Sequence, residues 1–200
     1  MSGRSSSARR SNRVRIVGGS WRSRVIVFPD LPGLRPTPDR VRETLFNWLG
    51  QDLTGKHCLD LYAGSGALGF EALSRGAASV TMVERAPRAS RALQANAALL
   101  GAHRLNIVCG DALEFLVQRP RLAWFDIVFL DPPFELGIPG DLWPRLLEVL
   151  AESGVVYLES EAEFAGHPQL HVLKRGHAGA VHYHLLGRTR DDQGGLSGNI

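Results

Sequence analysis

The sequence predicts an α/β fold, built on a mostly parallel sheet with a small β-hairpin before it. Between residues 57 and 159, short apolar runs alternate with helical patterns, a spacing typical of parallel β-α-β units. Two strand-like runs over 170–174 and 181–186 have no helix between them, which indicates an antiparallel pair at one edge of the sheet. Two β-rich runs also flank a Gly-Gly pair near the start, as in a hairpin.

The hairpin is expected over Arg13–Phe28, with its turn at Gly18-Gly19. Its second run contains Arg22 and Arg24, which are two residues apart. Because side chains alternate along a strand, both arginines are expected on one face of the hairpin.

A helix is predicted after a loop rich in Pro and Gly over 30–36. Thr37 is expected as its N-cap, Pro38 as its first residue, and Gly50 ends it. The apolar stripe of this helix consists of Val41, Leu45, Trp48 and Leu49.

The alternating region follows the same logic throughout. Runs rich in Val, Ile, Leu and Phe predict buried strands, and apolar residues three and four apart predict helices packed on the sheet. The predicted strands are 57–62, 79–84, 105–109, 125–130 and 155–159, and the predicted helices are 67–75, 87–100, 112–118 and 142–151.

Charge is distributed unevenly along the 200 residues. The net charge is +3, yet the first 50 residues contain ten Arg and three acidic residues, and the remainder has an excess of acids. A basic segment before a mildly acidic body indicates a polyanionic partner that binds at one end. The composition, 44% hydrophobic and 22% charged, is typical of a globular protein and excludes a fibrous or disordered chain.

The sequence also indicates a compartment. No apolar run approaches the roughly 18 residues that span a bilayer, and the first 13 residues lack the hydrophobic segment of a secretory signal. Cys58 and Cys109 are expected as small core residues, which fits a reducing environment. No Cys/His spacing is typical of a zinc site. We therefore expect a cytoplasmic protein with no metal and no membrane attachment.

A glycine-rich loop joins the first strand of the alternating region to its helix, with the sequence Asp60-Leu-Tyr-Ala-Gly64-Ser-Gly66. Gly64 and Gly66 allow a tight turn and a close approach of the backbone to a ligand. A tight turn without any ligand would use the same glycines. Asp60 favours a ligand with an ammonium group, because an acid beside the loop would repel the pyrophosphate of a dinucleotide.

Two further acids follow the next strands. Glu84 lies 20 residues after Gly64, where Rossmann-type sites place an acid on ribose hydroxyls. Asp111 follows the third strand, where it is expected to accept a hydrogen bond from an adenine amine. Asp111 is equally suitable as the N-cap of the following helix.

The tetrapeptide Asp131-Pro132-Pro133-Phe134 follows the most apolar strand. The prolines stiffen the loop and remove two amide donors, so that nearby carbonyls can accept hydrogen bonds from a substrate. Asp131 adds a carboxylate acceptor, and Phe134 offers a flat face. The tetrapeptide therefore predicts a clamp for a planar group with an exocyclic amine, stacked on one side and held by two acceptors. With a carboxyl pKa near its ordinary value of about 3.9, Asp131 is expected to be a weak base at neutral pH.

These four motifs, in this order, resemble those of class I S-adenosylmethionine-dependent methyltransferases. The tetrapeptide is similar to the Asn/Asp-Pro-Pro-aromatic motif of enzymes that methylate amino nitrogens. Two segments, over 15–24 and 34–49, resemble hallmark segments of the RsmD family. That family comprises bacterial 16S rRNA guanine-N2 methyltransferases that act at the guanine conventionally numbered 966. The resemblance covers about residues 13–187.

The resemblance implies a Rossmann-like class I methyltransferase fold, with a seven-stranded sheet whose last strand is antiparallel. It implies S-adenosyl-L-methionine as the cofactor, and a monomer that acts on 16S rRNA within the small ribosomal subunit. The implied site consists of Asp60, Tyr62, Gly64, Gly66, Glu84, Asp111 and Ala112 for the cofactor, and of Asp131, Pro132, Pro133 and Phe134 for catalysis.

The domain division follows from both arguments. We expect a flexible basic arm over 1–12, an RNA-docking hairpin extension over 13–36, the methyltransferase domain over 37–190 and a loose tail over 191–200. Arg42 is expected beside the active site, and Arg35, Thr37 and Arg40 are expected to close over it. The candidate RNA-binding residues are Arg10, Arg13, Arg15, Arg22, Arg24, Arg35 and Arg40.

Several alternatives stay open at this point. The tetrapeptide fits equally an enzyme that methylates adenine N6 of DNA or rRNA, or a protein glutamine. A cytosine-C5 enzyme would need a nucleophilic Cys in the substrate pocket. A nicotinamide-dependent oxidoreductase would use the glycine loop but not the tetrapeptide, and an RNA-binding assembly factor would need no turnover.

Overall fold

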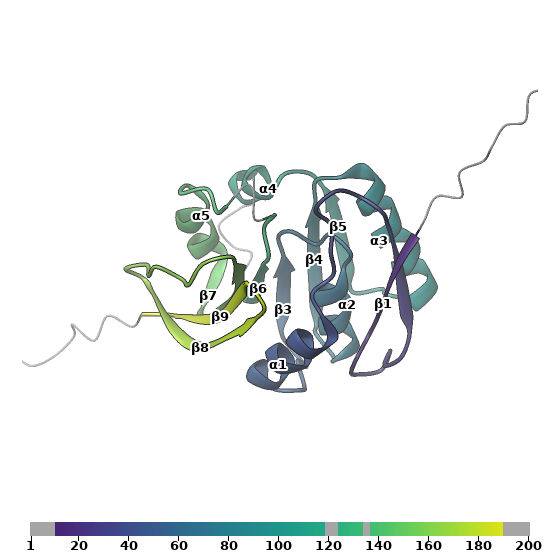
Figure 1. Cartoon of the computed structure of the whole chain (residues 1–200), viewed down its shortest axis with the longest axis horizontal. Helices are drawn as coiled ribbons and strands as arrows, with labels where there is room; N and C mark the ends of the chain where they lie inside the picture. The colour runs from purple at the N-terminus through teal and green to yellow at the C-terminus, as the bar shows by residue number, and fades with distance from the viewer. Residues whose placement is uncertain (1–10, 119–123, 134–136, 190–200) are drawn as a thin grey trace, which may run out of the picture.

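The structure is a computed structural model that describes residues 11–118, 124–133 and 137–189 (Figure 1). In this part of the chain, a sheet of seven strands forms the centre and a two-stranded sheet packs beside it. The strands of the larger sheet are β3 (His57–Asp60), β4 (Ser79–Glu84), β5 (Leu105–Cys109), β6 (Phe125–Leu130), β7 (Leu150–Ser160), β8 (Leu170–Ala178) and β9 (Val181–Arg188).

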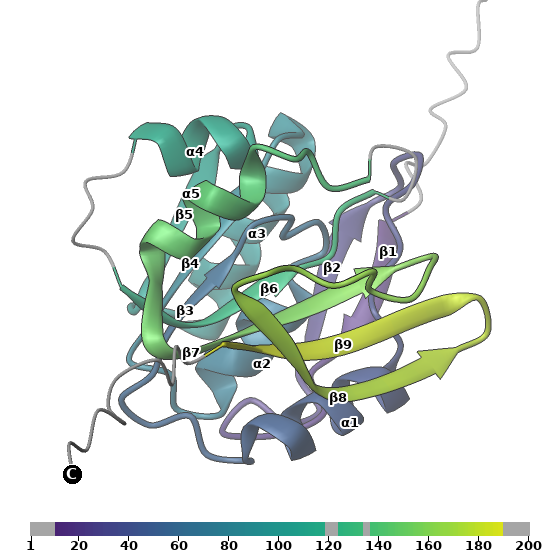
Figure 2. The same cartoon turned by 90° about the vertical axis from the view of Figure 1, so that its left-hand side faces the viewer.

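The larger sheet has the order β5-β4-β3-β6-β7-β9-β8. Strands β3 to β7 are parallel to one another, and β9 is antiparallel to both β7 and β8. The prediction of a mostly parallel seven-stranded sheet with an antiparallel pair at one edge is therefore confirmed. In Figure 2 the β8–β9 pair projects in front of the parallel strands.

Helices cover both faces of this sheet (Figures 1 and 2). One face packs against α1 (Asp39–Leu49), α2 (Ala67–Ser74) and α3 (Pro87–Leu100), and the other against α4 (Ala112–Gln118) and α5 (Leu142–Val149). The strands alternate accordingly: Ile127 and Phe129 belong to the first core, whereas Val128 and Leu130 belong to the second. The same alternation determines which side chains share a face at the carboxyl ends of the strands.

The predicted hairpin forms from β1 (Ser11–Arg15) and β2 (Val25–Pro29), which are antiparallel. Its connection is longer than expected, because Arg15 already pairs with Val25. The prediction that Arg22 and Arg24 share a strand face is therefore wrong, since both precede β2. The connecting backbone bonds to the end of α2 instead of extending the ladder: the amide of Trp21 donates to Ser74 Oγ at 2.8 Å.

The hairpin shares its core with the body of the protein. Its buried apolar side chains belong to the same cluster as those of α1 and α2. Asn96 of α3 extends the small sheet, because its side-chain amide donates to Val27 O at 2.8 Å and accepts from Val27 N at 3.0 Å. The buried hairpin residues are Val14, Ile16, Ile26 and Phe28.

A buried ion-pair network joins the hairpin to two helices. Glu71 of α2 accepts from Arg42 at 3.0 Å and from Arg75 at 2.8 Å, and Arg42 and Glu71 are fully buried. Glu71 also accepts from the amide of Val17, and Arg42 donates to the carbonyl of Arg15 at 2.7 Å. We call Arg42, Glu71 and Arg75 the hairpin anchor. The expectation that Arg42 lies beside the active site is wrong, because its guanidinium is used inside the fold.

Some predicted boundaries need correction. Helix α1 begins at Asp39, with Pro38 at the N-cap position and no side-chain cap, so Thr37 is not the N-cap. Strand β7 begins at Leu150 rather than at residue 155, because a shift in register between β6 and β7 lets pairing start earlier. Cys58 is buried as expected, but Cys109 is exposed at the end of an outer strand.

No helix in the part of the chain that the structure describes is long and apolar enough to cross a membrane.

Candidate active site

Four acidic side chains lie at the carboxyl ends of four neighbouring strands. Glu84 ends β4, Asp60 ends β3, Asp131 follows β6, and Glu159 lies at the end of β7. All four continue rows of side chains on the face covered by α1 to α3, as Asp131 does two residues after Phe129. We call these four residues the carboxyl row. Sheet order and strand polarity thus bring together residues that are up to 99 positions apart in sequence.

Asp60 is the most deeply buried member of the carboxyl row. Burial raises its pKa to about 7, and the negative charge of Glu84 acts in the same direction. Backbone amides of Gly69 and Tyr62 donate to this carboxyl and oppose the shift. Gly69 leaves room for the side chain of Met82, since a Cβ there would lie 2.3 Å from the terminal methyl carbon of Met82. Asp60 is therefore a carboxyl that would gain from a cationic neighbour.

The glycine loop between β3 and α2 is held by Glu84. Gly64 and Gly66 have positive φ angles of 51° and 81°. The amide of Gly64 donates to Glu84 at 2.8 Å, and the amide of Ala86 donates to the other oxygen at 2.6 Å. A Cβ on Gly66 would lie 2.5 Å from a methyl carbon of Leu93, so this glycine is also needed for packing.

Asp111 caps α4, as one of its two interpretations predicted. Its Oδ1 accepts from the amides of Leu113 and Glu114 at 2.9 and 3.2 Å. Tyr62 lies close to it: burial first, and then the charge of Asp111, raise the pKa of the Tyr62 hydroxyl. Ala112 beside it is buried. A cavity of about 330 Å³ adjoins this point and is lined by Val108, Cys109, Gly110, Asp111, Glu114, Phe115 and Gln118.

The loop after β6 begins with Asp131, a buried Pro132 and an exposed Pro133. Burial, Glu159 and Asp60 together raise the pKa of Asp131 well above its ordinary value. The expectation of an ordinary carboxyl is therefore wrong, because the sequence did not reveal these neighbours. Phe134 lies outside the described residues. A cavity of about 290 Å³ adjoins this loop, and its walls include Pro132, Ile138, Trp143 and Phe164.

Glu159 is a candidate site residue that the sequence analysis missed. It is 5% exposed and accepts a hydrogen bond from the hydroxyl of Tyr157 at 2.8 Å. The hydroxyl of Thr37 also donates to it, and both hydrogen bonds oppose the rise in its pKa that burial causes. The available signal was its position, since Glu159 ends its predicted strand over 155–159 as Glu84 ends its own over 79–84.

The segment before α1 crosses the carboxyl row. Leu34 lies over the glycine loop, because a Cβ on Gly64 would be 3.8 Å from the Cγ of Leu34. Thr37 reaches Glu159 at the other end of the row. Arg35 and Arg40 are exposed on this segment and on the first turn of α1.

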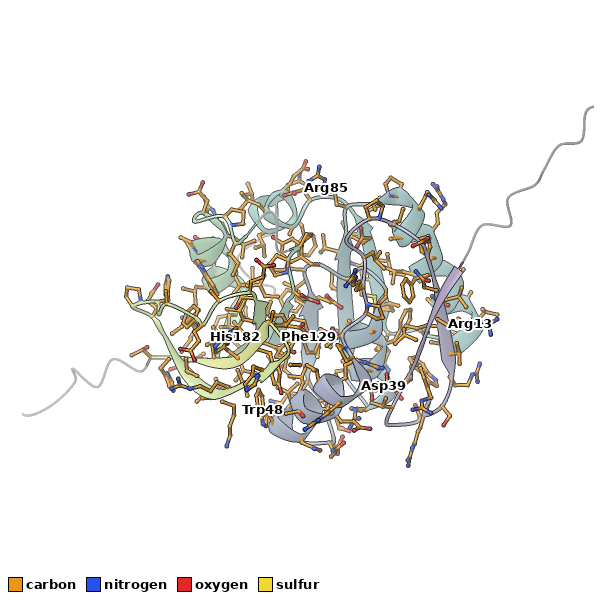
Figure 3. The ribbon with its side chains drawn as sticks, in the orientation of Figure 1. Arg13, Asp39, Trp48, Arg85, Phe129 and His182 are labelled. Atoms are coloured by element: carbon orange, nitrogen blue, oxygen red, sulfur yellow. The ribbon has the colours of Figure 1, made fainter. Side chains whose placement is uncertain are left out.

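The candidate RNA-binding arginines lie on the surface rather than among the acids. Arg13 and Arg22 are exposed on the hairpin and its connection, and Figure 3 shows Arg13 at the outer side of β1. Arg15 pairs with Asp39 at 3.1 Å, and Arg24 donates to the carbonyl of Leu99 at 3.1 Å. Arg10 lies outside the described residues.

The charge of the carboxyl row indicates the kind of ligand that fits. Over residues 11–118, 124–133 and 137–189, none of the four acids forms an ion pair. The same residues contain no group of three or more His, Cys, Asp or Glu that could hold a metal ion. Positive-φ glycines and acids without a cationic partner suit an organic ligand with cationic groups.

Comparisons with known proteins show the family to which this chain is similar. The family described as "Conserved hypothetical protein 95" matches residues 14–187. Ribosomal RNA small subunit methyltransferase D of Escherichia coli K12 is 48% identical over 156 residues, which cover 76% of this chain and 77% of that protein. The solved structure of the yhhF protein of Escherichia coli is 42% identical, with a TM-score of 0.78 over 88% of this chain and 98% of that one.

A more distant structure, SMU.776 complexed with SAH, has the same fold with a TM-score of 0.64 at 18% identity, over 81% of this chain and 53% of that one. The sheet order, the glycine loop after β3 and the Asp-Pro-Pro loop after β6 define a class I methyltransferase. The coverage and the sequence identity of the matches identify the family within this class. This chain belongs to the ribosomal RNA small subunit methyltransferase D family.

Proposed function

We propose that this protein transfers a methyl group from S-adenosyl-L-methionine to the exocyclic N2 of a specific guanine in 16S rRNA. The observation that supports this most is the carboxyl row beside the Asp131-Pro132 loop, in a chain that is 48% identical to a ribosomal RNA small subunit methyltransferase. The row favours a cationic cofactor, and the loop favours an amino group as the methyl acceptor.

The cofactor-binding residues follow from the geometry. S-Adenosyl-L-methionine supplies a methyl group that is already activated on a sulfonium. Asp60 would bind the ammonium group, because a buried carboxyl with a raised pKa gains most from a positive neighbour. Glu84 retains lone pairs for ribose hydroxyls, and Asp111 retains Oδ2 for the adenine amine. Tyr62, Gly64, Gly66 and Ala112 would shape the walls of this site.

The loop after β6 would position the acceptor. The Asp131 carboxylate and the Pro132 carbonyl would each accept a hydrogen bond from guanine N2, with Pro133 stiffening the loop and Phe134 stacked on the base. The lone pair of N2 is delocalised into the ring, so these two acceptors would make the nitrogen more nucleophilic. A carboxyl with a raised pKa is also a better proton acceptor near neutral pH than a solvated Asp.

The RNA substrate would bind across the arginine-rich N-terminal segment. We infer that the basic arm over 1–12 and the hairpin extension over 13–36 contact phosphates, and that Arg35, Thr37 and Arg40 close over the site between cofactor and RNA. The methyltransferase domain would span 37–190 and the tail 191–200. The assembled small subunit in the cytoplasm is the proposed substrate, and a monomer the proposed state.

Mapping 16S rRNA from cells that lack this protein tests the proposal. We expect one guanine to lose its N2 methyl group, and purified protein with S-adenosyl-L-methionine to restore it on small subunits. A full set of N2-methylated guanines in those cells would contradict the proposal. Transfer to DNA, to a protein glutamine or to adenine instead would favour the alternative amino-methyltransferases.

Asp131→Asn sharpens the test of the catalytic loop. We expect single-turnover methyl transfer to fall by at least about 100-fold, because the amide cannot take up a proton. The Kd for S-adenosyl-L-methionine should stay within about threefold, since Asp131 is not among the proposed cofactor-binding residues. An equal loss of binding and transfer would show that Asp131 is structural.

A further inference from the structure

We infer that Glu159 is a positioning residue for methyl transfer: it holds a negative charge beside Asp131, so that Asp131 is the carboxyl that takes up the proton from the acceptor nitrogen. This inference rests on the proposed function. It adds a residue to the site that neither the glycine loop nor the Asp-Pro-Pro loop contains.

Strand register places the two carboxyls side by side. Strands β6 and β7 are parallel, and Leu130 pairs with Leu158. The next residues along the two strands are Asp131 and Glu159, whose side chains point to the same face. Neighbouring strands are about 4.8 Å apart, so the buried Glu159 carboxyl and the partly buried Asp131 carboxyl are close enough to interact strongly.

Hydrogen-bond donors decide which carboxyl ionises first. Glu159 accepts from the hydroxyls of Tyr157 and Thr37, and both bonds favour its ionised form. No residue in the described ranges donates a hydrogen bond to the Asp131 carboxyl. Glu159 therefore takes the first negative charge of the pair, and the second charge, on Asp131, is resisted.

The groups around the two carboxyls also favour the ionisation of Glu159 before that of Asp131. Asp60 on β3 faces Asp131 with a further carboxyl, and Tyr183 on β9 pairs with Glu159 in the sheet. The groups of the described residues that act on the two carboxyls are thus acids and hydroxyls, without a cation among them. A proton on Asp131 is favoured by each acidic neighbour, which suits a base that accepts a proton during the reaction.

Methyl transfer to guanine N2 is accompanied by the loss of a proton from that nitrogen. As guanine N2 forms its bond to the methyl carbon, the bond between that carbon and the sulfonium sulfur would break, with its electron pair left on sulfur. One N2–H bond would break in turn, and an O–H bond would form on the Asp131 carboxylate. The positive charge of the reactants leaves the nitrogen with that proton. Asp131 is partly accessible, so the proton then passes to water and the carboxylate is restored. Glu159 remains ionised throughout and forms no bond to the substrate.

Glu159→Gln tests the inference, because glutamine keeps the size and an acceptor oxygen for Tyr157 but removes the charge. In the protein without cofactor or RNA, the titration of the Asp131 carboxyl is followed by carbon NMR, with Asp131→Asn to assign the signal. We expect the midpoint to move to lower pH by about one pH unit or more. The acidic limb of single-turnover methyl transfer should move in the same direction, and the high-pH plateau should fall several-fold.

Two further variants keep the test informative. Tyr157→Phe removes one donor to Glu159, so we expect a smaller shift in the same direction. Glu152→Gln, an exposed acid at the far end of the same strand, should leave both measurements unchanged. An unchanged Asp131 midpoint in folded Glu159→Gln would overturn the inference, even if transfer were slower. Failure of the proposed function would differ, since wild-type protein would then not methylate guanine at all.

Discussion

The hairpin anchor and the carboxyl row bury charge in opposite ways. In the anchor, Glu71 is surrounded by two guanidinium groups and a backbone amide, at distances of 2.8 to 3.0 Å. In the carboxyl row, acids have other acids as neighbours, and burial together with like charge raises the pKa of Asp60 to about 7. The two regions lie on the same face of the same sheet, and Glu71 belongs to α2, the helix that follows the glycine loop after Asp60.

This difference separates a structural use of charge from a functional one. A buried carboxylate with its own cations is neutralised inside the protein and has no need of a ligand. A buried carboxyl without a cation leaves a negative potential that a cationic ligand can satisfy. The hairpin anchor therefore fixes the position of the hairpin. The carboxyl row instead leaves a negative potential that the proposed cationic cofactor would neutralise.

Glu71→Ala should have the largest effect of the changes that test this comparison. Two buried guanidinium groups would lose their carboxylate, so we expect the free energy of unfolding to fall by about 3–5 kcal/mol. Urea denaturation at neutral pH measures this change. Glu148→Ala is the matched control, because its pair with Arg145 at 3.3 Å is exposed and should contribute less than about 1 kcal/mol. Similar losses for both variants would contradict the role of the anchor.

Asp60→Asn should raise the free energy of unfolding at high pH, whereas Glu71→Ala should lower it. The wild-type carboxyl has a folded-state pKa of about 7, above its ordinary value of 3.8, so the folded protein binds the extra proton. Its contribution to stability is fully present below the ordinary value and is lost as the pH rises through about 7. We expect the variant to be about 1–3 kcal/mol more stable than wild type at pH 8, and no more stable at pH 4.

The pH dependence of cofactor binding tests the role of the same carboxyl. Calorimetric titration with S-adenosyl-L-methionine should show an affinity that falls below about pH 7 in the wild type, by up to about tenfold per pH unit, because the ammonium group needs the ionised Asp60. Asp60→Asn should bind weakly at every pH. A variant that is both less stable at pH 8 and normal in binding would place Asp60 with the structural charges.

The sequence predicted most of the fold because its periodicities are local. Strand–helix alternation and the glycines after helices placed β4, α3, β5, α4 and β6 at their observed bounds. The hairpin connection was misjudged, since residues 20–24 look like the start of the second strand, whereas Ser20 and Trp21 form hydrogen bonds to the end of α2. Thr37 was misjudged for a similar reason: it looks like an N-cap, but its hydroxyl donates to Glu159, far along the chain.

The site was predictable only where a motif identifies it. Asp60, Glu84 and Asp131 follow recognisable loops, whereas Glu159 follows none and becomes visible through the sheet order β3-β6-β7. Raised pKa values depend on neighbours from other strands, so an ordinary carboxyl was the only expectation available for Asp131. Arg42 was predicted beside the active site but is a structural residue. An arginine in a basic segment gives no sign that a buried Glu71 will pair with it.

Arg22→Ala should have the smallest effect and extends the comparison to charge on the surface. Arg22 is exposed, so its removal should change the free energy of unfolding by less than about 0.5 kcal/mol. If it contacts a phosphate, RNA affinity should fall a few-fold and the slope of log K against log salt should shrink by about 0.9. Arg145→Ala is the control, since Arg145 is exposed on α5, which packs on the other face of the sheet. Equal effects of the two variants on the salt slope would mean that RNA senses net charge alone, and that the hairpin is not a docking surface.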